Sequence, residues 1–153
     1  MRILAAYKPS PEGQAVIEAA KQEAKLRGAE LVIARHVKRQ VAASATAGIP
    51  SGSEAQTPPR DEFGQDIEKV RQDMDTLVWD AKHEGIKCDV VVLEHGDDHA
   101  GPLLDLAKDG NFDMIVVGIR RRSRVGKAVL GSESQRILLA ADCPVLAVKA
   151  ARA

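Results

Sequence analysis

Aromatic residues are scarce in this chain of 153 residues, where one Trp, one Tyr and two Phe make up 3% of the sequence. Hydrophobic residues nevertheless make up 44%, and a single domain of this length can bury a substantial core. The sequence therefore predicts an aliphatic core of Val, Leu, Ile and Ala. An excess of charge of one sign is also lacking, because acidic and basic residues balance at 22 each. That balance argues against a surface built as a whole to bind nucleic acid.

Cysteine is scarce, and the N-terminal residues contain no long apolar run. Cys88 and Cys143 belong to no CxxC pair, so we expect two small buried thiols in a reducing cytoplasm. Residues 1–9 hold only about five apolar side chains, too few for a signal-peptide core or a membrane span. We therefore expect a cytoplasmic protein without a membrane segment. His36 and His83 have no obvious partners in the sequence and are expected at the surface or at an edge.

Segments with strand and helix character alternate along the chain. The expected strands are 3–7, 31–37, 88–93, 112–117 and 144–149. The expected helices are 11–27, 60–84, 99–108 and 132–141. Several strand segments are continuously apolar, which is typical of parallel strands covered on both faces. This alternation, with right-handed crossovers, predicts an α/β fold: one domain over residues 1–153, with a doubly wound, Rossmann-like parallel sheet of five strands flanked by helices.

Turn-forming residues mark where some of these elements begin and end. Ser10 before Pro11 predicts a helix start, because serine caps a helix and proline is tolerated at its first position. Gly28 predicts the end of that helix. Residues 40–59 are rich in Gly, Pro, Ser and Thr without any period, which predicts a long mobile loop. The apolar stripe of residues 60–84 predicts a helix that covers the sheet rather than a coiled coil.

Residues 118–132 form a glycine-bounded basic loop between an expected strand and an expected helix. The basic residues of the loop are Arg120, Arg121, Arg122, Arg124 and Lys127. The N–H groups of a first helical turn are unpaired, and the helix dipole adds partial positive charge there. In open parallel sheets, ligands bind beyond the carboxyl ends of the strands, where the winding direction reverses. The loop therefore predicts an anion site, with phosphate as the expected ligand.

Two common phosphate motifs do not fit this loop. A P-loop around Gly126 would need glycine where Arg121 stands and a hydroxyl where Ala128 stands. The dinucleotide motif GxGxxG is absent after the first expected strand. The basic run could instead be a solvated loop or a nucleic-acid contact, but side chains that could stack on bases are nearly absent. We therefore do not expect nucleic acid as a partner.

The motif that fits resembles the universal stress protein family. Its nucleotide-binding members carry Gly, two residues, Gly, nine residues and Gly-Ser. Gly118, Gly131 and Ser132 stand at the matching positions, and Arg121 replaces the second glycine. Further matching segments are 3–7, 35–37, 96–98, 112–118 and 141–148. The resemblance thus covers nearly the whole chain.

The resemblance implies that the chain binds ATP, or alternatively AMP or ADP, with Mg²⁺ left open. The implied contact residues are Tyr7, Lys8, Val37, Val117, Gly118, Arg120, Arg121, Gly131, Ser132, Glu133 and Ser134. Val37 would place a backbone group against the adenine, and Gly118 would allow close approach to the ribose and phosphates. The segment 131–134 would hold the phosphates. The resemblance also implies a homodimer through the last strand, Pro144 to Lys149, whose apolar edge would pair with a second copy.

Two residues depart from the family pattern. Lys8 stands where nucleotide-binding members usually have an acid that contacts the ribose. Arg121 removes a site of bare backbone, and its guanidinium could either clamp a phosphate or fill the pocket. Ser132 and Gln135 form a Ser-x-x-Gln capping box, which independently predicts a defined helix start at the anion site.

Other polar residues are interpreted as structural. His95, Asp97, Asp98 and His99 could suggest a metal site, but aspartates before a helix more often cap it, so no metal is expected. No spacing singles out a catalytic base for phosphoryl transfer. We therefore expect a nucleotide-binding regulatory protein of the stress response and not an efficient enzyme. The alternatives are a member that acts through protein partners without nucleotide, or a slow ATP hydrolase.

Overall fold

The computed structural model describes residues 1–38, 67–121 and 128–150. Within these residues, five parallel strands form a sheet in the order β3-β2-β1-β4-β6. The strands are β1 (Arg2–Tyr7), β2 (Glu30–Lys38), β3 (Cys88–His95), β4 (Met114–Arg121) and β6 (Val145–Lys149). The described helices are α1 (Pro11–Arg27), α2 (Ile67–His83), α3 (Ala100–Asp109) and α4 (Ser132–Ala140). The predicted doubly wound α/β fold is confirmed.

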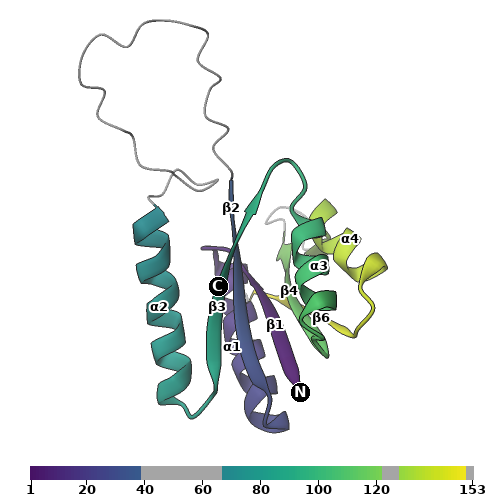
Figure 1. The fold of residues 1–153 in the computed structure, drawn as a ribbon. Helices are drawn as coiled ribbons and strands as arrows, with labels where there is room; N and C mark the ends of the chain where they lie inside the picture. The colour runs from purple at the N-terminus through teal and green to yellow at the C-terminus, as the bar shows by residue number, and fades with distance from the viewer. Residues whose placement is uncertain (39–66, 122–127, 151–153) are drawn as a thin grey trace, which may run out of the picture.

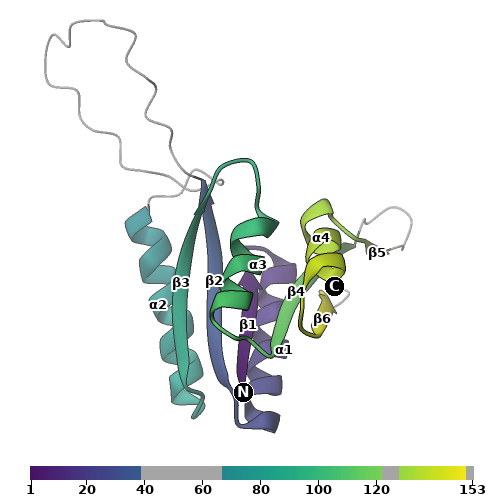
Figure 2. The same ribbon diagram turned by 45° about the vertical axis from the view of Figure 1, so that its right-hand side comes forward.

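Helices cover both faces of the sheet (Figure 1). Successive side chains of a strand point to opposite faces, so Ile3 and Ala5 of β1 join one apolar cluster and Leu4 joins the other. The first cluster lies under α1 and α2, and the second lies under α3 and α4 (Figure 2). Both clusters are largely aliphatic, as the shortage of aromatic residues predicts. Continuous apolar strands are thus explained by burial on both sides.

The winding of the sheet reverses between β1 and β4. Residues Arg2–Tyr7 of β1 pair with 30–35 of β2, and β3 adds beyond β2. The chain then returns to the other side of β1, where Ile3–Ala5 pairs with Met114–Val116 of β4. Strands β1 and β4 are neighbours in the sheet, and the helices that follow them, α1 and α4, pack on opposite faces. The chain therefore leaves the two strands in opposite directions at their carboxyl ends. This is the place where open α/β sheets bind ligands.

Helix α1 begins and ends where the sequence predicts. The side-chain oxygen of Ser10 accepts the N–H of Gly13 at 3.1 Å, and Pro11 is the first helical residue. Gly28 ends the helix in the left-handed conformation, with φ of 60°, which glycine adopts without steric penalty. Because Ser10 lies in the short turn after β1, the same residue fixes the passage from the central strand into the helix.

The structure corrects the predicted boundaries near the basic loop. Strand β4 continues through Arg121, four residues beyond the predicted end at 117, and its end pairs antiparallel with a short strand that was not predicted, β5 (Ala128–Val129). The capping-box prediction is wrong: Gly131 is the N-cap of α4, and Ser132 is already helical, with no side-chain cap bond. The Ser132 hydroxyl therefore lies inside the first turn, where it cannot serve as an N-cap.

Two further sequence predictions meet the structure only in part. Cys88 is buried, and burial raises the pKa of its thiol to about 11, whereas Cys143 is only partly buried. The expected loop 40–59 and the expected helical residues 60–66 lie outside the described residues. Among the helices that are described, none combines the length and apolar character needed to span a membrane.

Candidate functional site

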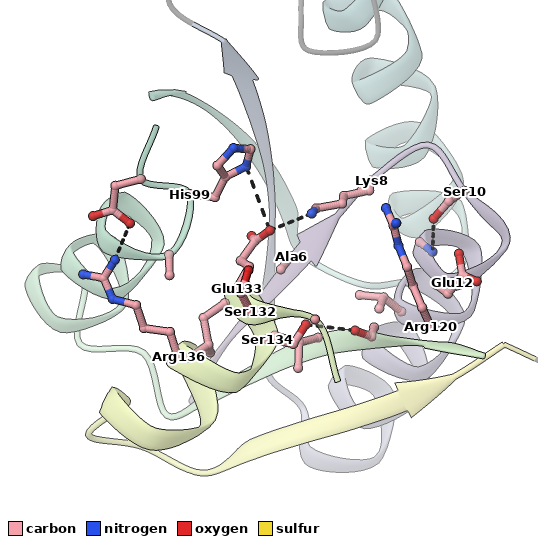
Figure 3. Close-up of a pocket in the computed structure, with 18 of the residues that line it drawn as sticks. Ala6, Lys8, Ser10, Glu12, His99, Arg120, Ser132, Glu133, Ser134 and Arg136 are labelled. Carbon is pink, nitrogen blue, oxygen red and sulfur yellow. Dashed lines mark hydrogen bonds and ion pairs between the residues drawn. The ribbon is translucent and has the colours of Figure 1, made fainter. Parts of the chain in front are cut away.

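A cavity of about 490 Å³ opens at the carboxyl ends of β1 and β4 (Figure 3). Its volume falls within the roughly 300–1,000 Å³ that is usual for small-molecule sites. Its walls come from the end of β1 and the start of α1, the end of β4, the residues before α3, and the first turns of α4. The lining residues are Ala6, Lys8, Ser10, Glu12, Gly13, Val16, Asp97, Asp98, His99, Ala100, Val117, Gly118, Arg120, Gly131, Ser132, Glu133, Ser134, Arg136 and Ile137.

The first wall is a tight turn from β1 into α1. The N–H of Ser10 donates to the Lys8 carbonyl at 2.8 Å. A Cβ added at Gly13 would lie 1.7 Å from the same carbonyl oxygen, so only glycine lets the helix start this close to the strand. The turn therefore has little freedom, and it presents Lys8 at the cavity.

The second wall depends on Gly118 in β4. A Cβ at this position would lie 3.2 Å from Cβ of Glu12 and 3.3 Å from Cγ2 of Val16. The glycine expected to admit a ligand thus also lets β4 lie against the start of α1. Its carbonyl accepts a hydrogen bond from Oγ of Ser134 at 3.1 Å, which fixes the first turn of α4 on the strand.

The third wall is the N-terminus of α4. Gly131 accepts the N–H of Gln135 at 2.9 Å and so begins the helix. The next three N–H groups, those of residues 132–134, have no acceptor within a helix of this geometry, and all three residues line the cavity. A Cβ at Gly131 would meet no atom within 4 Å. The helix therefore offers amide donors and a positive dipole end to an open space.

A cluster of ionisable side chains surrounds the carboxylate of Glu133, in the first turn of α4. Nζ of Lys8 donates to Oε2 of Glu133 at 2.6 Å. Nε2 of His36 lies 3.7 Å from Oε1 of Glu133, and Nδ1 of His99 lies 4.0 Å from Oε2. Figure 3 shows Lys8 and His99 reaching the Glu133 carboxylate from different elements. A cation from β1 and a carboxylate from α4 thus bridge two walls of the cavity.

His36 and His83 are both expected from the sequence at the surface or at an edge, and the structure agrees only for His83. His36 lies at the end of β2 with its side chain only 2% exposed, so the expectation of a surface position is wrong. Near the carboxyl end of β2, its side chain lies beside the cluster around Glu133. His83 is exposed and stacks on Trp79 with ring centroids 4.4 Å apart, as a surface histidine would.

Asp98 has the structural role predicted for it. Its Oδ1 accepts the N–H of Gly101 at 3.0 Å in the first turn of α3, and it also pairs with Arg136 of α4. The hydrogen bond from Gly101, with the Arg136 guanidinium beside it, holds the pKa of this carboxyl below its usual value. Within the described part of the chain, no group of three potential ligands is placed to hold a metal ion.

A model of the universal stress protein family matches residues 1–149 of the chain. The chain belongs to the universal stress protein family. A Thermus aquaticus relative, the universal stress protein in the QAH/OAS sulfhydrylase 3′ region, is 32% identical over 147 residues, which are 96% of this chain and 97% of that protein. A Mycolicibacterium smegmatis universal stress protein is 46% identical over 54 residues, 35% of this chain and 42% of that protein.

Solved structures of universal stress proteins share the fold. The Archaeoglobus fulgidus protein in complex with dAMP superposes with a TM-score of 0.64 at 22% identity, covering 97% of this chain and 98% of that one. An Arabidopsis thaliana family protein with AMP bound gives 0.62 at 14% identity, covering 99% and 92%. A universal stress protein in complex with cAMP gives 0.64 at 18% identity, covering 99% and 98%.

The structure brings most of the predicted contact residues of this universal stress protein to one cavity. Those that line it are Lys8, Val117, Gly118, Arg120, Gly131, Ser132, Glu133 and Ser134. Tyr7 and Val37 do not line it; both are buried in the apolar cluster under α1 and α2. Tyr7 points to the sheet face opposite to Ala6 and Lys8, as strand alternation requires. The side chain of Arg121 lies outside the described residues.

Sequence reasoning missed several wall residues. Glu12 and Gly13 line the cavity because α1 starts after only a short turn at the carboxyl end of β1. Their signal was available, since the first turn after a central strand faces the switch point. His99 and Arg136 reach the cavity through the packing of α3 against α4, and no local pattern predicts that contact.

Proposed function

We propose that this universal stress protein binds an adenine nucleotide in the cavity between β1 and β4, with ATP as the expected ligand. It would act as a cytoplasmic regulatory protein of the stress response whose conformation or partners depend on nucleotide occupancy. The observation that carries the proposal is the open N-terminus of α4 at the cavity wall, beside Gly131. Amide donors and a helix dipole favour phosphate there. The complexes of family members with dAMP, AMP and cAMP support an adenine base.

The charges of the cavity fit a phosphorylated ligand only in part. Arg120 is exposed at the cavity from the end of β4 and would reach phosphate oxygens as a charged donor. Lys8, in contrast, already holds Glu133. That contact favours a second candidate, a universal stress protein that acts through protein partners without nucleotide, because the cation nearest β1 is neutralised by the chain itself.

Calorimetric titration with ATP, ADP and AMP separates the two candidates. We expect saturable binding by the parent protein and its loss, by roughly tenfold or more, in Gly131→Glu, where a carboxylate would enter the anion site. The substitution meets no atom at Cβ and a φ of −63°, so the fold should persist. Leu139→Glu is the matched control, because it adds the same charge to the same helix at a residue 80% exposed. Absence of binding by the parent protein would leave the second candidate.

We propose binding and not rapid catalysis as the activity. The two cavity carboxylates with defined contacts, Glu133 and Asp98, are both held by cations, so neither is positioned as a free base. Phosphate release from ATP should therefore stay well below about 1 s⁻¹, the lower end of the ordinary enzyme range. A faster turnover would make the protein an enzyme.

We further propose a homodimer through β6. Among the described strands, β6 pairs with β4 only, and its residues Val145–Val148 are half-buried in the single chain. A half-buried apolar strand at the edge of a sheet is prone to pair with another strand. The same strand of a second copy of the chain would form hydrogen bonds with the backbone groups at this edge.

A further inference from the structure

Side chains from four elements meet at the carboxylate of Glu133. Lys8 follows β1, His36 lies near the carboxyl end of β2, His99 precedes α3, and Glu133 itself lies in the first turn of α4. The carboxylate side chain is 16% exposed, and the Lys8 ammonium is hydrogen-bonded to it. A carboxylate in the first turn of a helix is stabilised by the helix dipole. The Lys8 ammonium and the helix N-terminus therefore both suit an oxyanion, and in this chain the oxyanion is the protein's own carboxylate.

A bound phosphate would need the same surroundings. Carboxylate and phosphate oxygens are recognised by the same donors, namely ammonium groups and the N–H groups of a helix N-terminus. The N–H of Glu133 is one of those donors, and its side chain lies in the same cavity. A phosphate placed there would be repelled by the carboxylate and could not contact Lys8 while Glu133 holds it.

We propose that Glu133 occupies the oxyanion position of the ligand-free cavity and that a phosphate group of the nucleotide displaces it from Lys8. This inference rests on the proposed nucleotide binding. Glu133 is then a specificity-determining residue. Phosphate groups compete with its carboxylate for Lys8, whereas the nucleoside part of a ligand does not. The site then discriminates among adenosine, AMP and ATP by how far their phosphates extend toward Lys8 and α4.

A purely structural role for the Lys8–Glu133 contact makes a different prediction. If the ion pair only ties β1 to α4, its removal should change protein stability and the affinity for every ligand alike. If Glu133 competes with phosphate, its removal should strengthen binding only of phosphorylated ligands. The dependence of affinity on the number of phosphates therefore separates the two roles.

The test is a calorimetric series with adenosine, AMP and ATP on the full chain. In Glu133→Gln, which keeps the shape and removes the charge, AMP and ATP should bind roughly tenfold tighter or more, with adenosine unchanged. Lys8→Gln should weaken ATP binding and leave adenosine unchanged. The double variant gives the coupling between the two residues. Glu23→Gln is the matched control, because it removes a carboxylate that pairs with Arg27 at 2.8 Å on α1 and lines no part of the cavity.

Inorganic pyrophosphate serves as a probe without a base. It should raise the melting temperature of Glu133→Gln and leave that of the parent protein almost unchanged. Stabilisation of the variant by pyrophosphate, with no adenine compound bound by either protein, would sustain the role of Glu133 and refute the proposed function. Equal nucleotide binding by parent and variant, with pyrophosphate stabilising neither, would overturn the role of Glu133 and leave nucleotide binding intact. If neither protein binds any adenine compound or pyrophosphate, both the proposed function and the role of Glu133 are refuted.

Discussion

Two glycines of the cavity wall have different roles, which residue type alone does not reveal. Gly118 and Gly131 both match the glycine motif of the family, but their surroundings differ. Gly118 lies against Glu12 and Val16 of α1, whereas Gly131 borders open space. The first glycine is required by packing within the protein. The second is free to serve a ligand.

Alanine should therefore destabilise the protein at the first of these two positions and change its stability little at the second. Gly118→Ala should lower the free energy of unfolding by about 1–3 kcal/mol, because its Cβ would push β4 away from α1. Gly131→Ala should stay within about 1 kcal/mol of the parent protein, since its φ of −63° suits alanine and no atom lies near the new Cβ. Urea unfolding measures both. A larger loss in Gly131→Ala than in Gly118→Ala would contradict this assignment.

At this scale, the sequence reveals which residues lie at the site but not what they touch. Lys8 and Glu133 are both predictable as site residues from the family resemblance. Their contact joins positions 125 residues apart and depends on how α4 is docked on β4, which no local pattern encodes. For the same reason, His36 is mistaken for a surface residue until the end of β2 is placed beside α4.

At the scale of elements, α1 and α2 are tied together beneath the sheet. Glu84 follows α2 directly and forms ion pairs with Lys21 and Lys25 of α1. The hydrogen bonds from these two lysines lower the pKa of Glu84 to about 2 from its ordinary 4.5. The ionised carboxylate is therefore stabilised more in the folded chain than in the unfolded one.

This tie predicts a defined pH dependence. A lowered pKa contributes stability above the unfolded value of 4.5, and the contribution is lost as the pH falls toward about 2. Glu84→Gln should therefore lower the melting temperature at neutral pH, with the difference from the parent protein shrinking between pH 4.5 and 2. Asp75→Asn is the control, because this exposed carboxylate of α2 has no ion-pair partner among the described residues. A difference that stays constant down to pH 2 would exclude the tie.

Most helices and strands are predictable from the sequence, and the wrongly predicted end of β4 has a physical cause. Apolar runs and caps locate α1 and the buried strands to within a few residues. The end of β4 is missed because glycine and arginine interrupt the apolar run after Val117. The strand continues through its pairing: Gly118 pairs with Val148 of β6, and Arg120 pairs with Val129 of β5. Tertiary pairing there overrides the local pattern.

At the scale of the whole molecule, the free edge of β6 predicts the assembly state. The carbonyl of Pro144 accepts from Ile115 of β4, so strand alternation directs the N–H of Ala147 to the opposite, free edge. Light scattering at micromolar concentration should give twice the chain mass of 16.4 kDa. Ala147→Pro removes the edge donor and should give monomers, whereas Ala147→Gly keeps the N–H and should remain dimeric. A monomeric parent protein would rule out this interface.

The pairing of β1 with β4 has a consequence for how the chain is made on the ribosome. The N–H of Arg2 donates to Oδ2 of Asp113 at 2.7 Å, a contact between residues 111 positions apart. The central strand β1 thus leaves the exit tunnel long before its second neighbour, β4. Until then one side of β1 has no strand beside it, and such a nascent edge is open to wrong partners. During synthesis, therefore, one edge of the central strand stays unpaired until β4 has emerged.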